Sequence, residues 1–390
     1  FGGIKMKIPQ MMDLDLKDQR TIIRLDLNVP IENGEITSDA RIKASIPTIL
    51  AAQEKGAKVI LLSHLGRPDP ENIDTRFSLQ PVAKRLGKLI NQDIDFASNW
   101  TESIPDHGNI VLCENTRYHK GEKSNDAAFA KCIASLCDVF VMDAFGASHR
   151  KHASTYGAIQ FAKKACAGPL LSSEIDSLKK AMGDPEKPLV AVIGGAKVSS
   201  KLGVIESLAS ICDCIIVGGG IANTFLLANG NSVGNSLVET DMVEAAERIL
   251  QLKQVHVPIP TDVVVAKEFS SEAIALEKSI DQVEEDDLIL DIGPETTNVY
   301  KELISKARTI IWNGPVGVFE IEQFSQGTQQ VAMAIKDNQG YKIVGGGDTV
   351  AVIEKYGITD SISYVSTGGG AFLEFVKSGT LDALEVLAQH

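Results

Sequence analysis

The sequence of 390 residues lacks the features that mark several classes of protein. It has no apolar run near 18 residues, so we expect no transmembrane helix. Residues 1–10 lack the apolar segment of a secretory signal peptide. The six cysteines form no CxxC pair and have no histidine at zinc spacing. We therefore expect reduced thiols and a cytoplasmic location.

An excess of basic residues is also missing. The formal net charge is −13, which argues against nucleic acid as the main partner. The charge is unevenly distributed: residues 1–170 hold 22 Lys+Arg and 20 Asp+Glu, a net +2, whereas the remainder holds 16 and 31, a net −15. The first part is therefore the better candidate for binding an anionic substrate, although uneven surface charge without a ligand is the alternative.

Short apolar runs alternate with helical patterns along the whole chain, which favours parallel α/β sheets. A break at Gly168-Pro169 and a helix over about 170–182 predict a connector between two such domains. The predicted strands are 21–27, 59–62, 110–113, 139–142, 189–193, 214–217, 259–264, 288–292, 310–312, 341–344 and 363–365. Because Pro260 lies inside one of them, we expect 259–264 to be an edge strand. In the first part, helices are predicted from a cap at Ser38-Asp39 to about Lys55, and over about 79–89 and 125–136.

Polar side chains follow the strands of the first part at the point where each strand ends. Ligands of open α/β sheets bind beyond the carboxyl ends of the strands, so we expect these side chains to share one edge. Guanidinium groups bind oxyanions in pairs of hydrogen bonds, which indicates a phosphate or carboxylate ligand. A set of coincidental surface positions is the alternative. The candidates are Asp26, Asn28, His64, Arg67, Arg117 and Arg150, with Arg41 in the first turn of the nearby helix.

Glycine-rich segments follow the strands of the second part, at 194–195, 218–220, 345–347 and 368–370. Glycine allows a backbone to approach a ligand closely, and a helix N-terminus presents free N–H groups that suit phosphate. Asp348 follows the third segment and could hold a metal ion that accompanies a phosphate. Lys197 and Lys201, at i and i+4, are expected to share one helical face. Neither GxxxxGK[ST] nor GxGxxG is present, so a Walker A loop is absent and a dinucleotide site is weakly supported.

The chain resembles the phosphoglycerate kinase family over nearly its whole length. The matching motifs, in the family's order, are RLDLNVP at 24–30, SHLGRP at 63–68, ENTR at 114–117, DAFG at 143–146, GGAKV at 194–198, WNGP at 312–315, GGGDT at 345–349 and STGGG at 366–370. The segment before Lys5 has no counterpart in the family pattern. The resemblance implies two doubly wound, Rossmann-like parallel-sheet domains joined by a hinge helix, with a cleft between them. The domains would span 1–170 with the tail 378–390, and 171–377.

The same resemblance implies the ligands and the roles of the site residues. The first domain would bind 3-phosphoglycerate, and the second would bind ADP or ATP with Mg²⁺. The substrate residues would be Asp26, Asn28, Arg41, His64, Arg67, Arg117 and Arg150. The nucleotide residues would be Lys201, Asn313, Glu320, Gly346, Gly347, Asp348 and Thr349, with Asp348 on the metal. Arg41, Lys197, Lys201 and Gly369 would act in catalysis, and the protein would be a monomer.

The reaction implied is reversible transfer of a phosphoryl group between 1,3-bisphosphoglycerate and ADP, giving 3-phosphoglycerate and ATP. Such a transfer needs alignment and neutralisation of charge more than proton chemistry. One alternative is a catalytically silent nucleotide-binding protein on the same fold. A dehydrogenase on a doubly wound sheet is a second alternative, but the glycine fingerprint that it requires is missing.

Overall fold

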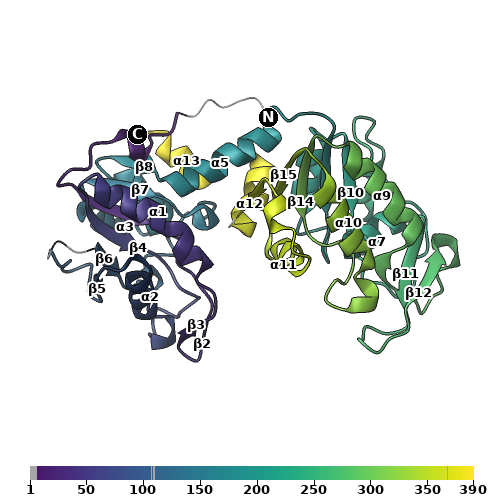
Figure 1. Ribbon diagram of the computed structural model, residues 1–390, viewed down its shortest axis with the longest axis horizontal. Coiled ribbons are helices and arrows are strands. Elements are labelled where there is room, and N and C mark those ends of the chain that lie inside the picture. Colours follow the sequence, from purple (N-terminus) through teal and green to yellow (C-terminus); the bar gives the residue numbers. More distant parts are fainter. Residues whose placement is uncertain (1–6, 107, 109, 367) are drawn as a thin grey trace. The chain divides into compact units, whose positions relative to one another are not determined.

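The computed structural model describes residues 7–390 except 107, 109 and 367. Contacts within the chain divide it into two compact units. Unit 1 comprises Phe1–Asp176 and Thr380–His390, and unit 2 comprises Ser177–Gly379. The division falls inside helix α5 (Pro169–Met182), which therefore carries the chain from one unit into the other (Figure 1). Residues 1–4, for which the family pattern offers no counterpart, and Thr367 of the last glycine motif lie outside the described residues.

Unit 1 is built on a six-stranded sheet with the order β5-β6-β4-β1-β7-β8. All of its pairings are parallel. The strands are β1 (Arg20–Arg24), β4 (Lys58–Leu62), β5 (Ile94–Ala97), β6 (Ile110–Cys113), β7 (Val139–Met142) and β8 (Ala165–Ala167). Because β1 lies between β4 and β7, the chain reverses its direction across the sheet at β1, and this switch point is where ligands of such sheets bind.

Helices and a small hairpin complete unit 1. The helices are α1 (Ala40–Glu54), α2 (Gln80–Ile90), α3 (Ala127–Ser135), α4 (Ala158–Phe161) and α13 (Asp382–Leu387). Strands β2 (Ile31–Glu32) and β3 (Glu35–Ile36) form the hairpin. Its turn uses Asn33 and Gly34 with positive φ, the conformation that these residue types tolerate best. Helix α13 is held by the hydrogen bond from Ala383 N to Ser148 O, so the end of the chain packs on unit 1.

Unit 2 contains a five-stranded parallel sheet with the order β10-β9-β14-β15-β16. Its strands are β9 (Leu189–Ile193), β10 (Cys214–Val217), β14 (Thr309–Asn313), β15 (Tyr341–Val344) and β16 (Tyr364–Val365). Its helices are α6 (Leu202–Ala209), α7 (Gly219–Ala228), α8 (Val243–Leu250), α9 (Pro294–Lys306), α10 (Gln326–Asp337), α11 (Gly347–Lys355) and α12 (Gly369–Ser378). β9 and β14 are buried along their whole length, which explains their continuous apolar sequence. The expected α/β class with parallel sheets is confirmed.

A second sheet in unit 2 corrects one prediction. Strands β11 (Asp262–Ala266), β12 (Leu276–Ser279) and β13 (Leu288–Ile292) form an antiparallel sheet in which β11 is central. The sequence predicted an edge strand over 259–264 because proline cannot donate to a ladder. Pro260 instead precedes the strand, so it removes no hydrogen bond from the ladder and leaves β11 free to pair on both sides.

Two further differences from the predictions concern the site. The strand predicted over 21–27 ends at Arg24, and residues 25–27 are not part of a strand. Lys197 and Lys201 do not share a helical face, because α6 begins only at Leu202 and Lys201 is its N-cap.

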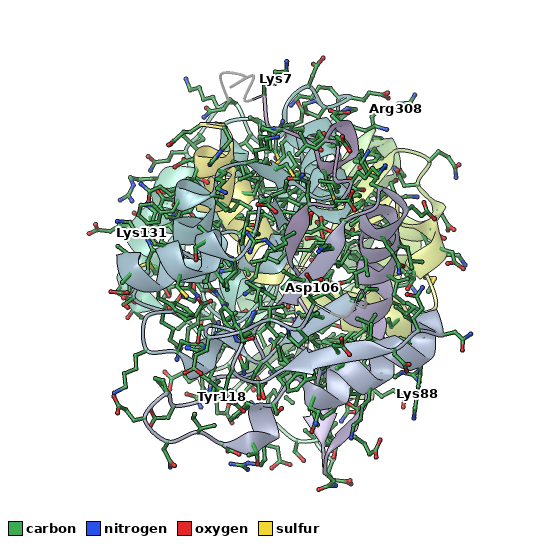
Figure 2. All side chains as sticks on the ribbon, turned by 90° about the vertical axis from the view of Figure 1, so that its left-hand side faces the viewer. Lys7, Lys88, Asp106, Tyr118, Lys131 and Arg308 are labelled. Atoms are coloured by element: carbon green, nitrogen blue, oxygen red, sulfur yellow. The ribbon has the colours of Figure 1, made fainter. Side chains whose placement is uncertain are left out.

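No helix of the described residues is long and apolar enough to cross a membrane. Charged side chains such as Lys88 and Lys131 extend outward from unit 1 (Figure 2).

Candidate functional site

The loop that follows β1 places Asp26 and Asn28 beside the loop that follows β4. Oδ1 of Asp26 accepts hydrogen bonds from Arg41 Nη1 at 3.2 Å and from Asn28 N at 3.2 Å. Arg41 Nη1 also donates to Asn28 O at 2.8 Å. Oδ1 of Asn28 accepts from Gly66 N at 2.8 Å. Because Arg41 comes from the first turn of α1, the structure joins three separate segments at the carboxyl edge of the sheet.

His64 lies two residues after the end of β4 and is buried, with 4% of its surface exposed. Its Nδ1 lies 3.1 Å from Arg24 Nη2. Burial holds the pKa of His64 well below its ordinary value of 6.5, and the neighbouring Arg24, Arg117, Arg150 and Arg41 lower it further. The imidazole is therefore neutral at physiological pH and can donate a hydrogen bond from only one nitrogen.

Arg117 and Arg150 bring two further guanidinium groups to the same edge. Arg117 lies in a short 3₁₀ turn, Thr116–Tyr118, and donates from Nη1 to Gly66 O. Its Nε is buried and has no hydrogen-bond partner among the residues that the structure describes. Burial lowers the pKa of Arg117 to about 10, and repulsion from Arg150, Arg24 and Arg67 adds to this shift. An unpartnered donor among mutually repelling cations indicates that an anion is the missing partner.

The remaining substrate candidate, Arg67, is exposed, and Arg150 donates from Nε to His149 Nε2 at 3.2 Å. Arg67 and Arg150 each lie close enough to Arg117 to lower its pKa. The structure thus gathers the sequence-predicted residues of unit 1 around His64 and Arg117. The arrangement can bind a small oxyanion, because guanidinium groups from several loops converge on one place.

In unit 2, the glycine turns at the carboxyl ends of the parallel strands pack directly against one another. A Cβ on Gly194 would lie 1.8 Å from Pro315 O, and one on Gly219 would lie 2.8 Å from Gly195 O. A Cβ on Gly369 would lie 3.3 Å from Gly346 Cα. Only glycine permits such close approach of backbones. The turns therefore form one continuous backbone surface, as the repeated pattern predicted.

Lys201 lies within this surface. Its Nζ donates to the carbonyl oxygens of Gly194 and Asn313, the latter at 3.2 Å. Burial lowers the pKa of Lys201 to about 8, and the charge of Asp348 opposes that shift. Lys197 is exposed on the loop before α6. The ammonium of Lys201 thus lacks a carboxylate hydrogen-bond partner among the described residues, and a phosphate could supply the missing negative charge.

The other nucleotide candidates surround the start of α11. Gly346 caps that helix with φ of 99°, and Gly347 and Asp348 are exposed in its first turn. Thr349 is fully buried, and its hydroxyl accepts from Gly314 N at 2.7 Å and donates to Gly345 O at 3.0 Å. Its hydroxyl is therefore already used, so only its backbone N–H remains for a ligand.

Asn313 and Glu320 complete the predicted nucleotide set. Asn313 donates from Nδ2 to Gly345 O at 2.6 Å, whereas its buried Oδ1 has no hydrogen-bond partner within the described part of the chain. Glu320 lies exposed in the turn after β14. The structure therefore places Asn313 among the glycine turns and Glu320 at their surface.

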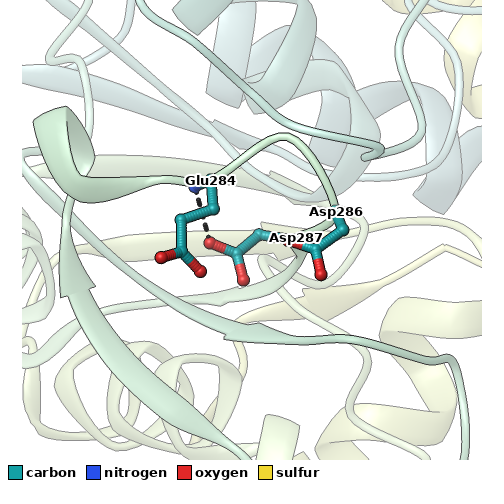
Figure 3. Close-up of side chains that lie close together, drawn as sticks. All are labelled: Glu284, Asp286 and Asp287. Carbon is teal, nitrogen blue, oxygen red and sulfur yellow. Dashed lines mark hydrogen bonds between the residues drawn. The ribbon is translucent and has the colours of Figure 1, made fainter.

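A cluster of carboxylates elsewhere in unit 2 resembles a metal site but is an ion-pair network. Glu284, Asp286 and Asp287 have carboxylate oxygens within 4.8 Å of one another (Figure 3). Lys267 approaches all three, at 2.7, 2.6 and 3.0 Å. Lys278 pairs with Glu284 at 3.0 Å and with Asp287 at 2.7 Å. The lysines neutralise the carboxylates, so this acidic turn is structural.

Sequence reasoning assigned no role to three residues that contact the site. Arg24 belongs to a matched motif, but its contact with His64 joins the last residue of β1 to the segment after β4. The spacing of these residues in the sequence therefore does not predict the contact. Glu122 accepts from Ser154 N and from the hydroxyls of Ser154 and Thr116, next to Arg117. Glu239 accepts from Ser199 N at 2.9 Å and from Ser199 Oγ, and so secures the loop between Lys197 and Lys201.

An arginine cluster on one α/β unit and glycine turns around a buried lysine on the other are the features expected of an α/β phosphotransferase. A model of the phosphoglycerate kinase family matches residues 11–379. A curated phosphoglycerate kinase of Nitratidesulfovibrio vulgaris is 50% identical over 389 residues, covering 99% of both chains. The chain belongs to the phosphoglycerate kinase family.

Solved structures show the same relationship. The phosphoglycerate kinase of Coxiella burnetii matches with a TM-score of 0.93 and 49% identity, over 98% of this chain and 99% of that one. The phosphoglycerate kinase of Pyrococcus horikoshii OT3 matches with a TM-score of 0.81 and 32% identity, over 97% and 98%. The protein is therefore a kinase, an ATP-binding transferase of glycolysis, as the sequence motifs predicted.

Proposed function

We propose that this chain catalyses reversible phosphoryl transfer between 1,3-bisphosphoglycerate and ADP, with the three-carbon substrate on unit 1. Three features of unit 1 support the assignment: the unpartnered Nε of Arg117, the repulsion among its arginines, and the neutral His64. 3-Phosphoglycerate carries a phosphate and a carboxylate, the two anions that guanidinium binds best. The proposed substrate residues are Asp26, Asn28, Arg41, His64, Arg67, Arg117 and Arg150.

The nucleotide is proposed to bind the glycine turns of unit 2. Lys201 would contact its phosphates, because its buried ammonium has only carbonyl partners among the described residues. The N–H groups at Gly346, Gly347 and Thr349 would add donors at the start of α11. We propose that Asn313 contributes through its unpartnered Oδ1, and that Glu320 reaches the ribose.

Asp348 is the proposed ligand of Mg²⁺. Its carboxylate is exposed in the first turn of α11, close enough to Lys201 to influence its pKa. An oxygen donor beside a phosphate site fits the preference of Mg²⁺ for one or two carboxylates together with phosphate oxygens. When bound, the ion would offset negative charge on the nucleotide phosphates.

The chemical step would depend on positioning and on positive charge. Arg41, Lys197 and Lys201 would neutralise the transferring group, and the N–H of Gly369 would add a hydrogen bond. A general base is not required, because the acceptor carboxylate has no proton to lose. The two ligands are assigned to different units, so we propose that transfer occurs only when both units hold their ligands.

We also propose a monomeric, cytoplasmic protein without a nucleic-acid partner.

The direct test is ADP formation from Mg-ATP with and without 3-phosphoglycerate, with the product 1,3-bisphosphoglycerate removed by a coupled reductase. ADP formation that depends on 3-phosphoglycerate is the expected result. Tight ADP binding without turnover would instead favour the catalytically silent nucleotide binder. Every charged position of the matched motifs is present in the sequence, so no residue favours that alternative.

A further inference from the structure

The ring of His64 has a single hydrogen-bond partner among the described residues, the guanidinium of Arg24. The contact joins His64 Nδ1 and Arg24 Nη2 at 3.1 Å. A guanidinium can only donate, and a protonated imidazole also donates from both nitrogens. His64 Nδ1 must therefore be an acceptor in this contact, which leaves the one ring proton on Nε2.

The Arg24 side chain is itself held in place by buried partners. It is 1% exposed and donates from Nε to Ser154 Oγ at 2.8 Å and from Nη1 to Leu25 O. The hydroxyl of Ser154 in turn donates a hydrogen bond to Glu122 Oε1 at 2.6 Å. The guanidinium is therefore held by partners that all belong to unit 1.

Glu122 anchors the network and is completely buried. Its carboxylate accepts from Ser154 N at 3.0 Å and from Thr116 Oγ1 at 3.2 Å, in addition to the Ser154 hydroxyl. Its charge favours the protonated form of Arg24 and opposes the pKa decrease that burial causes. A buried carboxylate therefore balances the charge of the arginine that contacts His64.

We propose that Arg24 is a positioning residue for His64, with Glu122 as its anchor: it fixes the imidazole as the neutral tautomer that donates from Nε2. The identity of the acceptor, 3-phosphoglycerate, rests on the proposed function. The fixed tautomer does not, because it follows from the contacts of the free protein. His64 then supplies one directed hydrogen bond to the anion without adding a further positive charge to the cluster.

Four arginines around His64 act in the same direction. Arg24 on β1, Arg41 on α1, Arg117 in its 3₁₀ turn and Arg150 after β7 each disfavour the imidazolium. A protonated His64 would also lose its contact with Arg24, because two donors would face each other. Binding of the anion is therefore expected to be insensitive to the titration range of an ordinary histidine, near 6.5.

The test is ¹⁵N NMR of the full chain labelled at histidine, with the His64 signals assigned from a His64→Gln variant. In the free wild-type protein, Nε2 is expected to carry the proton, Nδ1 to be unprotonated, and neither to titrate near pH 6.5. In Arg24→Met, the pKa of His64 is expected to move closer to 6.5. Burial and the remaining arginines still oppose protonation of the imidazole in this variant, but the contact with Arg24 no longer does. KM for 3-phosphoglycerate should rise about tenfold while KM for ATP is unchanged.

Arg20→Met is the matched control, because Arg20 begins the same strand and is exposed beside Asp138. It should leave the His64 signals and both KM values unchanged.

A proton on Nδ1, or a charged His64 at pH 7 in the wild type, would overturn the proposal without any variant. If Arg24→Met does not fold, Ser154→Ala removes one anchor of the guanidinium and should produce a mixture of tautomers; an unchanged single tautomer would count against the network. Absence of 3-phosphoglycerate-dependent turnover with the expected tautomer would overturn the proposed function and uphold this inference.

Discussion

Binding of ADP is predicted to take up a proton at Lys201. In the free protein, burial among backbone carbonyls lowers the pKa of this ammonium to about 8. Nucleotide phosphates beside it would raise that pKa, since an opposite charge favours the protonated form. A group whose pKa rises on binding gains protons between its two pKa values. ADP binding should therefore take up about half a proton at pH 8 and about 0.9 at pH 9, from the fraction of neutral lysine at each pH.

The uptake can be measured by titration calorimetry of Mg-ADP in buffers with different ionisation enthalpies. Phosphate groups have their second pKa near 6, so above pH 8 the nucleotide contributes little to the proton balance. The affinity should fall by up to about tenfold per pH unit above 8, because the neutral lysine must first acquire its proton.

Lys201→Arg is the informative control. A guanidinium keeps its charge throughout this range, so the variant should bind ADP without proton uptake between pH 8 and 9. If wild-type binding takes up no proton there, Lys201 is either already charged or not in contact with the phosphates. An equal uptake in Lys201→Arg would assign the proton to a different group, and either result would refute the reasoning.

Three further predictions concern catalysis and stability. Arg41→Ala should reduce turnover about 10²-fold or more with little change in ADP affinity, as removal of one group that stabilises transition-state charge does; equal losses in both would contradict its role. Glu122→Gln should lower the free energy of unfolding by about 2–4 kcal/mol in urea, because an amide N–H would face buried donors; an unchanged midpoint would show that the carboxylate is dispensable. Gly194→Ala should lower Tm far more than Gly347→Ala, since its methyl would lie 1.8 Å from Pro315 O while the other meets nothing within 4 Å; similar Tm values would mean that the turns can separate without cost.

Much of the fold was predictable because local rules act on each segment separately. Buried parallel strands need continuous apolar sequence, so β6, β7, β9, β10 and β15 were predicted with the bounds that the structure shows. The bounds of the antiparallel strand β13 were also predicted correctly. Strands β5 and β8 were not predicted, because Asp95 interrupts the apolar sequence of β5 and β8 consists of three small residues. The position of β11 was misjudged because Pro260 was counted inside the strand rather than before it.

The candidate site was also predictable in part. The sequence by itself placed the charged residues of unit 1 and the glycines of unit 2 just beyond strand ends, and parallel pairing then brings strand ends to one edge. It could not place Lys197 and Lys201, because a four-residue spacing joins them only if the segment is helical, and the helix begins later.

Only the tertiary structure decided how these groups are connected. The contact between Arg24 and His64 spans two neighbouring strands, and the carboxylate of Glu122 reaches Arg24 through Ser154, far along the chain. Hydrogen bonds of this kind depend on side-chain direction and burial, which follow from the packing of the whole unit rather than from any local pattern. The sequence therefore determined which chemical groups are present and near which edge, and packing determined their protonation and orientation.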